Sequence, residues 1–274
     1  MDLKDPTECA FHINTKKNYC MEDSVIDELR NYAKEKKLVV NDNKDTIKKL
    51  MDIHDCKNES CLLTKSNIID VIGNDNAERQ LKERFKPEGP FDSFEWFSNV
   101  NIDDVLKQIS IKYKDQKFLH IEFQMRDFEK VGSELSRIDL AKEYTNGIRC
   151  FGVVFNTDYS SGRGQHWFSI FGNFKAAPFT IEYFNSTGHD PLPEISHWMK
   201  KTKHHMEKKL DIQVNDIVVS KIANQSDNHS CGSYSLYYII SRLEDVPYNH
   251  FTKNKIGDAT MHTFRKNYLF RRPV

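Results

Sequence analysis

The chain has 274 residues, with 40 basic and 40 acidic side chains, and 38% of its residues are hydrophobic. A formal net charge of zero gives no general electrostatic reason to bind nucleic acid or an acidic membrane. No apolar run approaches the roughly 20 residues that span a bilayer, and the first residues lack the apolar centre of a signal peptide. We therefore expect a soluble protein in a reducing compartment, with one ordinary domain and a smaller appendage.

The first 87 residues are polar, charged and helical in pattern. Apolar residues recur there at helical spacing, which predicts helices over residues 22–37, 45–54, 66–72 and 77–85. The sequence Lys-Pro-Glu-Gly-Pro at 86–90 then breaks any helix and is typical of a linker. We predict an N-terminal α-helical arm, residues 1–87, and a core, residues 88–274. The arm shows no catalytic constellation and is interpreted as a small packing or partner-binding unit.

The core alternates helical and strand patterns. Helices are predicted from 101 to about 109 and over 133–144, 192–210 and 258–268, besides the helix that follows Cys231. Strands are predicted over 118–123, 150–156, 167–172, 179–184 and 212–219. Helices and strands in this order predict an α+β domain with a small central sheet flanked by helices.

Six cysteines are present, at Cys9, Cys20, Cys56, Cys61, Cys150 and Cys231. Their spacing is irregular for a secreted disulfide framework. A zinc site at His54, Cys56 and Cys61 has a possible loop spacing but no clear fourth ligand nearby. Free thiols are the preferred interpretation, and no metal or cofactor is expected.

Cys231 stands at the start of an apolar helical run that continues to Leu243. A cysteine at this position faces the positive end of the helix dipole, which favours thiolate over thiol. Gln225 lies six residues upstream in a polar loop, from which its side-chain amide could reach back toward the sulfur.

His166 lies in an aromatic strand pattern, and Asn185 follows the next strand. Strand alternation puts Asn185 on a face where it can serve the imidazole, whereas Glu182 points away as an exterior residue or a partner in a core ion pair. Base, orienting amide, oxyanion donor and nucleophile, in the order His, Asn, Gln, Cys, are the parts of a cysteine protease.

Three segments carry a resemblance to a known family: GRGQHWFSIF, IEYFNSTG and QSDNHSCGSYSLYYI. They resemble the adenain and Ulp-type (SUMO-protease-like) clan of cysteine proteases. That clan has a His-Trp pair, an Asp or Asn about twenty residues later, and a Gln six residues before Cys-Gly. The resemblance covers the whole core and continues more weakly into the arm.

By this resemblance His166 is the general base, Asn185 the orienting residue, Gln225 the oxyanion donor and Cys231 the nucleophile, while Trp167 lies close to the substrate cleft. Most of the clan has Asp where this chain has Asn185, and Asn points toward a branch that processes viral structural polyproteins. The resemblance then implies cleavage after Gly-Gly-X, in the host-cell cytoplasm at the site of virus assembly and in the virion, without a cofactor.

Two other functions remain open. The same chemistry could serve an isopeptidase that removes SUMO or another ubiquitin-like modifier, and the fold could be kept in a binding module without catalysis. Intact His166, Gln225 and Cys231 argue against the second alternative. Cys150 begins an apolar strand and is expected to be buried and inert. The lysine-rich side of residues 192–210 is interpreted as a solvated face rather than a nucleic-acid site, because no aromatic residues are interleaved with it.

Overall fold

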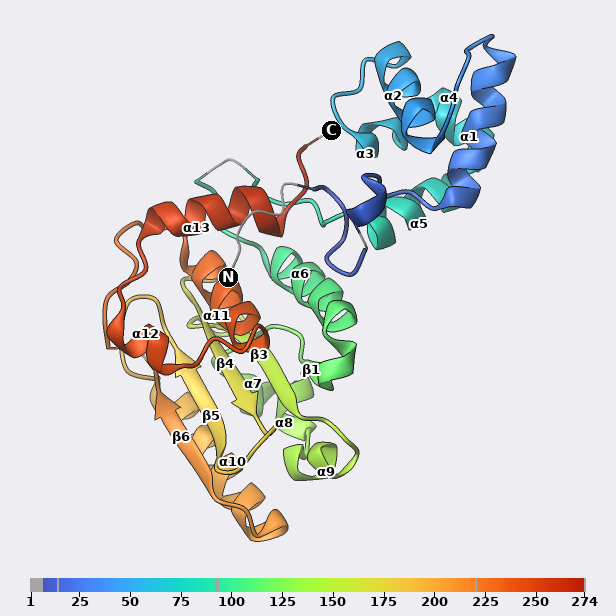
Figure 1. The fold of residues 1–274 in the computed structure, drawn as a ribbon. Helices are drawn as coiled ribbons and strands as arrows, with labels where there is room; N and C mark the ends of the chain where they lie inside the picture. Colours follow the sequence, from blue (N-terminus) through green and yellow to red (C-terminus); the bar gives the residue numbers. More distant parts are fainter. Residues whose placement is uncertain (1–6, 14, 92–93, 220, 274) are drawn as a thin grey trace. The chain divides into compact units, whose positions relative to one another are not determined.

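The computed structural model describes residues 7–13, 15–91, 94–219 and 221–273. It divides into two compact units, visible in Figure 1. We name Asp92–Arg265 the core unit, and Lys4–Phe91 together with Lys266–Val274 the arm unit. Among the helices that the structure describes, none combines the length and apolar character needed to cross a membrane.

One mixed sheet forms the centre of the core unit. Its strands are β1 (Phe118–His120), β2 (Gln124–Met125), β3 (Cys150–Asn156), β4 (Trp167–Asn173), β5 (Phe179–Phe184) and β6 (Val214–Val218). The order is β1-β3-β4-β5-β6, and β2 also pairs with β3. β4 runs antiparallel to its two neighbours β3 and β5, whereas β1 and β2 run parallel to β3 and β6 runs parallel to β5.

Helices cover both faces of this sheet (Figure 1). The core helices are α6 (Asn99–Lys112), α7 (Phe128–Val131), α8 (Glu134–Arg137), α9 (Leu140–Thr145), α10 (Pro193–Leu210), α11 (Cys231–Leu243), α12 (Asn249–Lys253) and α13 (Asp258–Phe264). Phe151 and Val153 pack with Trp198 of α10 in one apolar cluster. A Cβ on Gly152, between them in β3, would lie 3.0 Å from the Ile239 side chain of α11, so α11 covers the opposite face. This arrangement confirms the predicted α+β class.

Two predicted elements of the core are interrupted. The helix expected over 133–144 is two helices, because Ile138 is extended and the Asp139 side chain accepts hydrogen bonds from Ala141 N and Lys142 N, which starts a new helix. The strand expected over 118–123 ends at His120, and pairing with β3 resumes only at β2.

The arm unit is helical, as the sequence predicts. Its α-helices are α1 (Asp23–Glu35), α2 (Asn43–Ile53), α3 (Glu59–Leu62), α4 (Ser66–Ile72) and α5 (Asn74–Arg84). The segment Lys266–Val274, which the sequence assigned to the core, belongs to this unit. Its aromatic residues account for the difference: Tyr268 stacks on Phe11 at 5.1 Å between ring centroids, and the Phe270 ring lies directly against Gly89.

The expectation of six free thiols is wrong for the arm unit. Cys9 is bonded to Cys20 and Cys56 to Cys61, with Cα atoms 5.0 and 5.5 Å apart, in the usual range for disulfides. The spacing of the cysteines does not predict the first pair, because that pair depends on the path of the chain. An isolated β-bridge between Cys9 and Phe85 brings the start of the chain back to the helices. The second disulfide also removes both thiolates of the zinc alternative at His54.

Candidate active site

His166 and Asn185 meet at one end of two antiparallel strands. His166 immediately precedes β4 and Asn185 immediately follows β5, so the pairing of these strands brings the two residues together. His166 Nε2 lies 2.8 Å from Asn185 Oδ1. Thr187 N also donates to this oxygen, at 3.1 Å, which identifies Oδ1 as an acceptor. The His166 Nε2 therefore carries the hydrogen, and Nδ1 is left with the lone pair of a base.

The Asn185 amide is held at both ends. It is buried, and its Nδ2 donates to the Tyr183 hydroxyl at 3.0 Å. Burial lowers the pKa of His166, the hydrogen bond to Asn185 raises it, and nearby His189 lowers it; the net direction is down. The imidazole is therefore neutral at neutral pH, which is the form that accepts a proton.

Cys231 is the first residue of α11 and is almost completely buried. The backbone N–H groups of Trp167, Gly232 and Cys231 itself lie close enough to the sulfur to lower its pKa. Trp167 directly follows His166 in the chain, so the sulfur lies near the residue next to the imidazole. Burial nevertheless raises the pKa of Cys231 more than these donors lower it. The N–H groups at the helix start thus favour the thiolate, as predicted, but burial outweighs them and the thiol is the resting form.

The surroundings of Gly232 explain why a glycine follows Cys231. A Cβ at this position would lie 2.6 Å from the Phe97 ring, closer than side-chain atoms pack. The Phe97 carbonyl in turn accepts a hydrogen bond of 3.0 Å from Trp167 Nε1. The small residue thus lets the start of α11 approach the segment that fixes the Trp167 ring.

Gln225 lies beside the residue that follows Asn185. Its backbone N–H donates to the Ser186 carbonyl at 3.0 Å, and its Oε1 accepts from the Ser186 hydroxyl at 2.7 Å. Its Nε2 donates to the Asp227 carbonyl at 3.0 Å and makes a longer contact of 3.3 Å with Asp227 Oδ1. The structure thus brings Gln225 to the Asn185 end of β5, but the amide donor that the sequence expected to face the sulfur is engaged by Asp227.

Asp227 is a site residue that the sequence analysis missed. Its Oδ1 accepts from the N–H groups of His229 and Ser230 at 3.1 and 2.9 Å, and its Oδ2 accepts from the Ser230 hydroxyl at 2.6 Å. Burial raises the pKa of Asp227, but the hydrogen bonds from Ser230, His229 and His262 lower it to about 2. Asp227 therefore organises the turn into α11. No signal in the sequence points to it, because an Asp in a polar loop binds the following N–H groups only where the loop forms the right turn.

Trp167 is buried and lines a cavity of about 340 Å³ in the core unit. Trp96, Phe97 and Phe123 supply other aromatic walls, and Arg163 lies on the side of the loop between β3 and β4. Trp167 is thus a core residue, as predicted, that also lines this cavity, and its place beside a substrate cleft stays a prediction.

Glu182 resolves the two alternatives that alternation left open. Its carboxylate is fully buried and pairs with Arg242 Nε at 2.7 Å and Nη2 at 2.9 Å, while the Tyr238 hydroxyl donates to it at 2.6 Å. Glu182 is thus a partner in a core ion pair. The pair fastens β5, which ends beside Asn185, to α11, which begins at Cys231.

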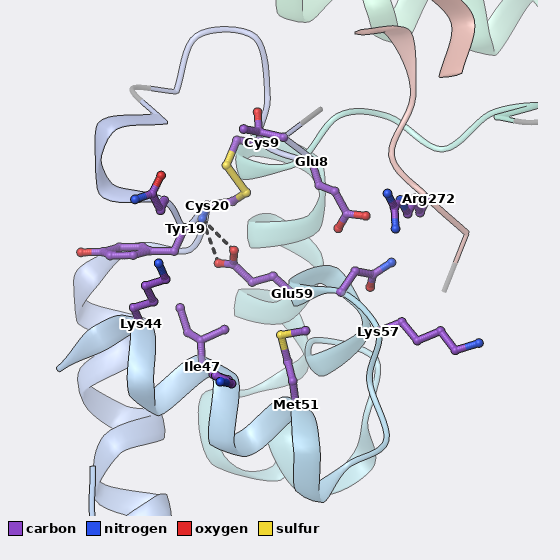
Figure 2. A pocket seen from close by; sticks show the side chains of 14 residues that line it. Glu8, Cys9, Tyr19, Cys20, Lys44, Ile47, Met51, Lys57, Glu59 and Arg272 are labelled. Carbon is purple, nitrogen blue, oxygen red and sulfur yellow. Dashed lines mark hydrogen bonds between the residues drawn. A yellow bond between two sulfur atoms is a disulfide. The ribbon is translucent and has the colours of Figure 1, made fainter. Parts of the chain in front are cut away.

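The arm unit contains a second cavity, of about 470 Å³, shown in Figure 2. Its apolar wall is formed by Ile47 and Met51. The basic side chains that line it are Lys44, Lys48, Lys57 and Arg272. Half-buried Glu59 accepts from Cys20 N and Met21 N, and its loss of solvation raises its pKa to about 7. The cavity thus combines an apolar wall with basic lining side chains.

Comparison with known proteins defines the class. Residues 146–271 match the Ulp1 protease family, C-terminal catalytic domain. A protein named as a cysteine protease, from an African swine fever virus isolate from Malawi, is 33% identical over 97% of this chain and 96% of its own. The chain therefore belongs to the Ulp1-type family of cysteine proteases.

Two further relatives agree with this assignment. An African swine fever virus isolate from Kenya has a protein named as a SUMO-1 cysteine protease, also 33% identical over 97% of this chain and 96% of its own. A crystal structure of the African swine fever virus protease superposes with a TM-score of 0.83 and 31% identity. The match covers 98% of this chain and 97% of that chain.

Proposed function

We propose that the protein is an endopeptidase in which Cys231 is the nucleophile, His166 the base, Asn185 its orienting partner and Gln225 an oxyanion donor. The observation that carries the assignment is the 2.8 Å contact between His166 Nε2 and Asn185 Oδ1, next in the chain to Trp167, whose backbone N–H lowers the pKa of Cys231. This arrangement supports the proposed nucleophile, base and orienting group of a cysteine protease.

The proposed reaction starts from the thiol and the neutral imidazole. His166 Nδ1 takes the thiol proton as the Cys231 sulfur attacks the scissile carbonyl. The oxyanion accepts hydrogen bonds from Cys231 N–H and, after a turn of its side chain away from Asp227, from Gln225 Nε2. His166 returns the proton to the leaving amine. Water, deprotonated by His166, then hydrolyses the thioester and restores the thiol.

We infer that the substrates are viral structural polyproteins cut after Gly-Gly-X, in the host-cell cytoplasm and in the virion. Near full-length similarity to African swine fever virus proteases supports this assignment. The test incubates the full chain with a peptide library and identifies products by mass spectrometry. Cleavage enriched after Gly-Gly-X is the expected result, and cleavage without any glycine preference contradicts it.

A second candidate substrate is a SUMO conjugate, because relatives carry the name of a SUMO-1 cysteine protease. The discriminating assay places a Gly-Gly-X peptide and a SUMO-linked isopeptide beside each other at equal concentration. An isopeptidase cleaves the conjugate far faster than the peptide. Cys231→Ser serves as the control for both substrates.

We propose that the arm unit binds large substrates and takes no part in the chemistry. The basic rim of its cavity, which includes Lys44 and Lys48, supports this role. In the full chain, Lys44→Glu with Lys48→Glu is expected to slow cleavage of a polyprotein and leave cleavage of a short peptide unchanged. Equal losses on both substrates contradict this division.

A further inference from the structure

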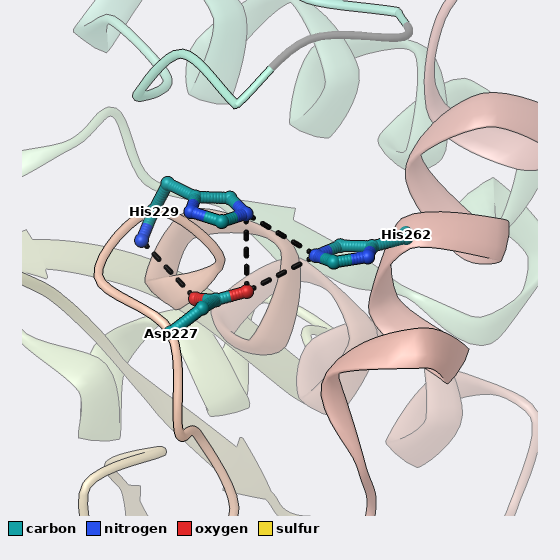
Figure 3. Close-up of side chains that lie close together, drawn as sticks. All are labelled: Asp227, His229 and His262. Carbon is teal, nitrogen blue, oxygen red and sulfur yellow. Dashed lines mark hydrogen bonds and ion pairs between the residues drawn. The ribbon is translucent and has the colours of Figure 1, made fainter.

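Three potential metal ligands converge in the core unit at a place that the proposed protease chemistry does not use. They are Asp227, His229 and His262, drawn in Figure 3. Asp227 and His229 lie in the loop that leads into α11, and His262 lies on α13. His229 Nε2 is 3.2 Å from His262 Nε2, and each of these nitrogens is 3.1 Å from Asp227 Oδ2.

The triangle of atoms has the size of one face of a tetrahedral zinc site. Zinc binds nitrogen and oxygen ligands at about 2.0–2.1 Å, so two ligands of a regular tetrahedron lie about 3.3–3.4 Å apart. The three observed separations fall within about 0.3 Å of that value. Two neutral imidazoles and one carboxylate are also ligands that zinc prefers.

Groups around the triangle already hold two of its ligands in place. Asp227 Oδ1 accepts the backbone N–H groups of His229 and Ser230, while Oδ2 accepts the Ser230 hydroxyl at 2.6 Å and also faces the two rings. His229 Nδ1 lies 3.4 Å from Asn228 Oδ1, a contact that puts the ring hydrogen on Nδ1 and the lone pair on Nε2. The His229 carbonyl is fixed by Arg265 Nη2 at 3.0 Å.

The surroundings leave room for a fourth ligand. Phe94 packs edge-on against His229 and His262, with centroids 4.8 and 5.8 Å away. The His229 ring is buried, whereas 41% of the His262 side chain is exposed, so one side of the triangle opens to solvent. Three protein ligands with an open position accept water as the fourth.

We propose that Asp227 Oδ2, His229 Nε2 and His262 Nε2 bind one zinc ion, with water in the fourth position. The ion joins the loop that carries Gln225 and Cys231 to α13. Because Asp227 also receives the Gln225 amide, the ion stabilises the loop conformation seen here. None of the three ligands acts on the peptide in the proposed chemistry.

The test uses the full chain with Cys231→Ser, which removes the active-site thiol as a competing ligand. Zinc is titrated against a chromophoric chelator, and one equivalent is expected to bind. His262→Gln removes one ligand and should weaken binding at least about 100-fold, since loss even of an outer-shell partner costs 10–100-fold. His205→Gln is the matched control, because His205 pairs with Asp139 at 3.0 Å on the surface and is in no three-ligand cluster of the described residues.

Two further readouts decide the outcome without relying on activity. Zinc should raise the melting temperature of the parent and of His205→Gln but not of His262→Gln. Cobalt(II) bound to the parent should show the intense visible absorption of tetrahedral coordination. This measurement needs no variant. Equal zinc affinity in parent and His262→Gln, or a weak octahedral cobalt spectrum, would overturn the proposal and leave the triangle a hydrogen-bond network.

Discussion

The core unit contains two buried free thiols, and they differ in what faces the sulfur. Cys150, at the start of β3, directs its sulfur to the carbonyl of Gln116 at 3.7 Å, and burial raises its pKa to about 12. Burial also raises the pKa of Cys231, but three backbone N–H groups oppose it. Burial alone therefore does not distinguish a nucleophile from a structural cysteine. An acceptor keeps the proton on Cys150, whereas the N–H groups near Cys231 favour a negative charge there, as the proposed nucleophile requires.

The largest expected effect separates the two thiols directly. Cys231→Ser should abolish peptide cleavage, because a hydroxyl is far harder to ionise than a thiol, and should leave the fold intact. Cys150→Ala removes a buried sulfur that no step uses and should keep kcat/KM within about twofold of the parent, well below the loss of a catalytic group. Circular dichroism checks both folds. Activity that survives Cys231→Ser and disappears with Cys150→Ala would reverse the assignment.

The imidazole is predicted to serve only one of the two thiols. His166→Ala should lower kcat/KM by up to about 10⁴-fold, because the base itself is lost. Asn185→Ala should be milder, since the neutral amide holds a ring that is still present. Steady-state kinetics on one peptide ranks the two variants. The opposite order would mean that another group orients or replaces the imidazole.

Substitution of Gln225 tests whether its side-chain amide donates a hydrogen bond to the oxyanion, as is proposed for the backbone N–H of Cys231. Gln225→Ala should lower kcat by roughly 10²–10³ with a smaller change in KM, as is typical when one oxyanion donor is lost. Gln225→Glu should be at least as damaging, because a carboxylate would face the developing charge. Alkylation of Cys231 by a small reagent should continue in Gln225→Ala, since displacement forms no oxyanion. A change in peptide cleavage within about twofold would remove Gln225 from this role.

The smallest effect is a shift of the pH profile. The pKa of His166 is lowered below its usual 6.5, so the basic form persists as pH falls and kcat/KM should decline only below pH 6.5. The Asn185 hydrogen bond raises that pKa, and Asn185→Ala should therefore move the acid limb to still lower pH. Rates measured from about pH 4 to about pH 8 follow the acid limb in both proteins. An acid limb above about pH 7 in the parent would contradict a neutral resting imidazole.

Periodicity and spacing could predict the contact between His166 and Asn185, because strand pairing alone brings the two residues together. They could not predict Asp227, since the direction of a loop side chain depends on the turn that the loop forms. The resting thiol was also missed, because a helix start is visible in the sequence whereas the burial of Cys231 depends on tertiary packing. The two disulfides could not be predicted for the same reason, because each depends on the path of the chain in three dimensions.

The segment Lys266–Val274 belongs to the arm unit although it follows the core unit in the chain. This affects the order in which the two units can fold during synthesis. Domains generally fold as units and from the N-terminus during synthesis. Here the helices of the arm emerge first, but the Tyr268 and Phe270 rings that pack on Phe11 and Gly89 are translated only after the entire core unit. The first unit to be made is thus the last to be completed, and the nascent arm exposes the surfaces around Phe11 and Gly89 throughout translation of the core.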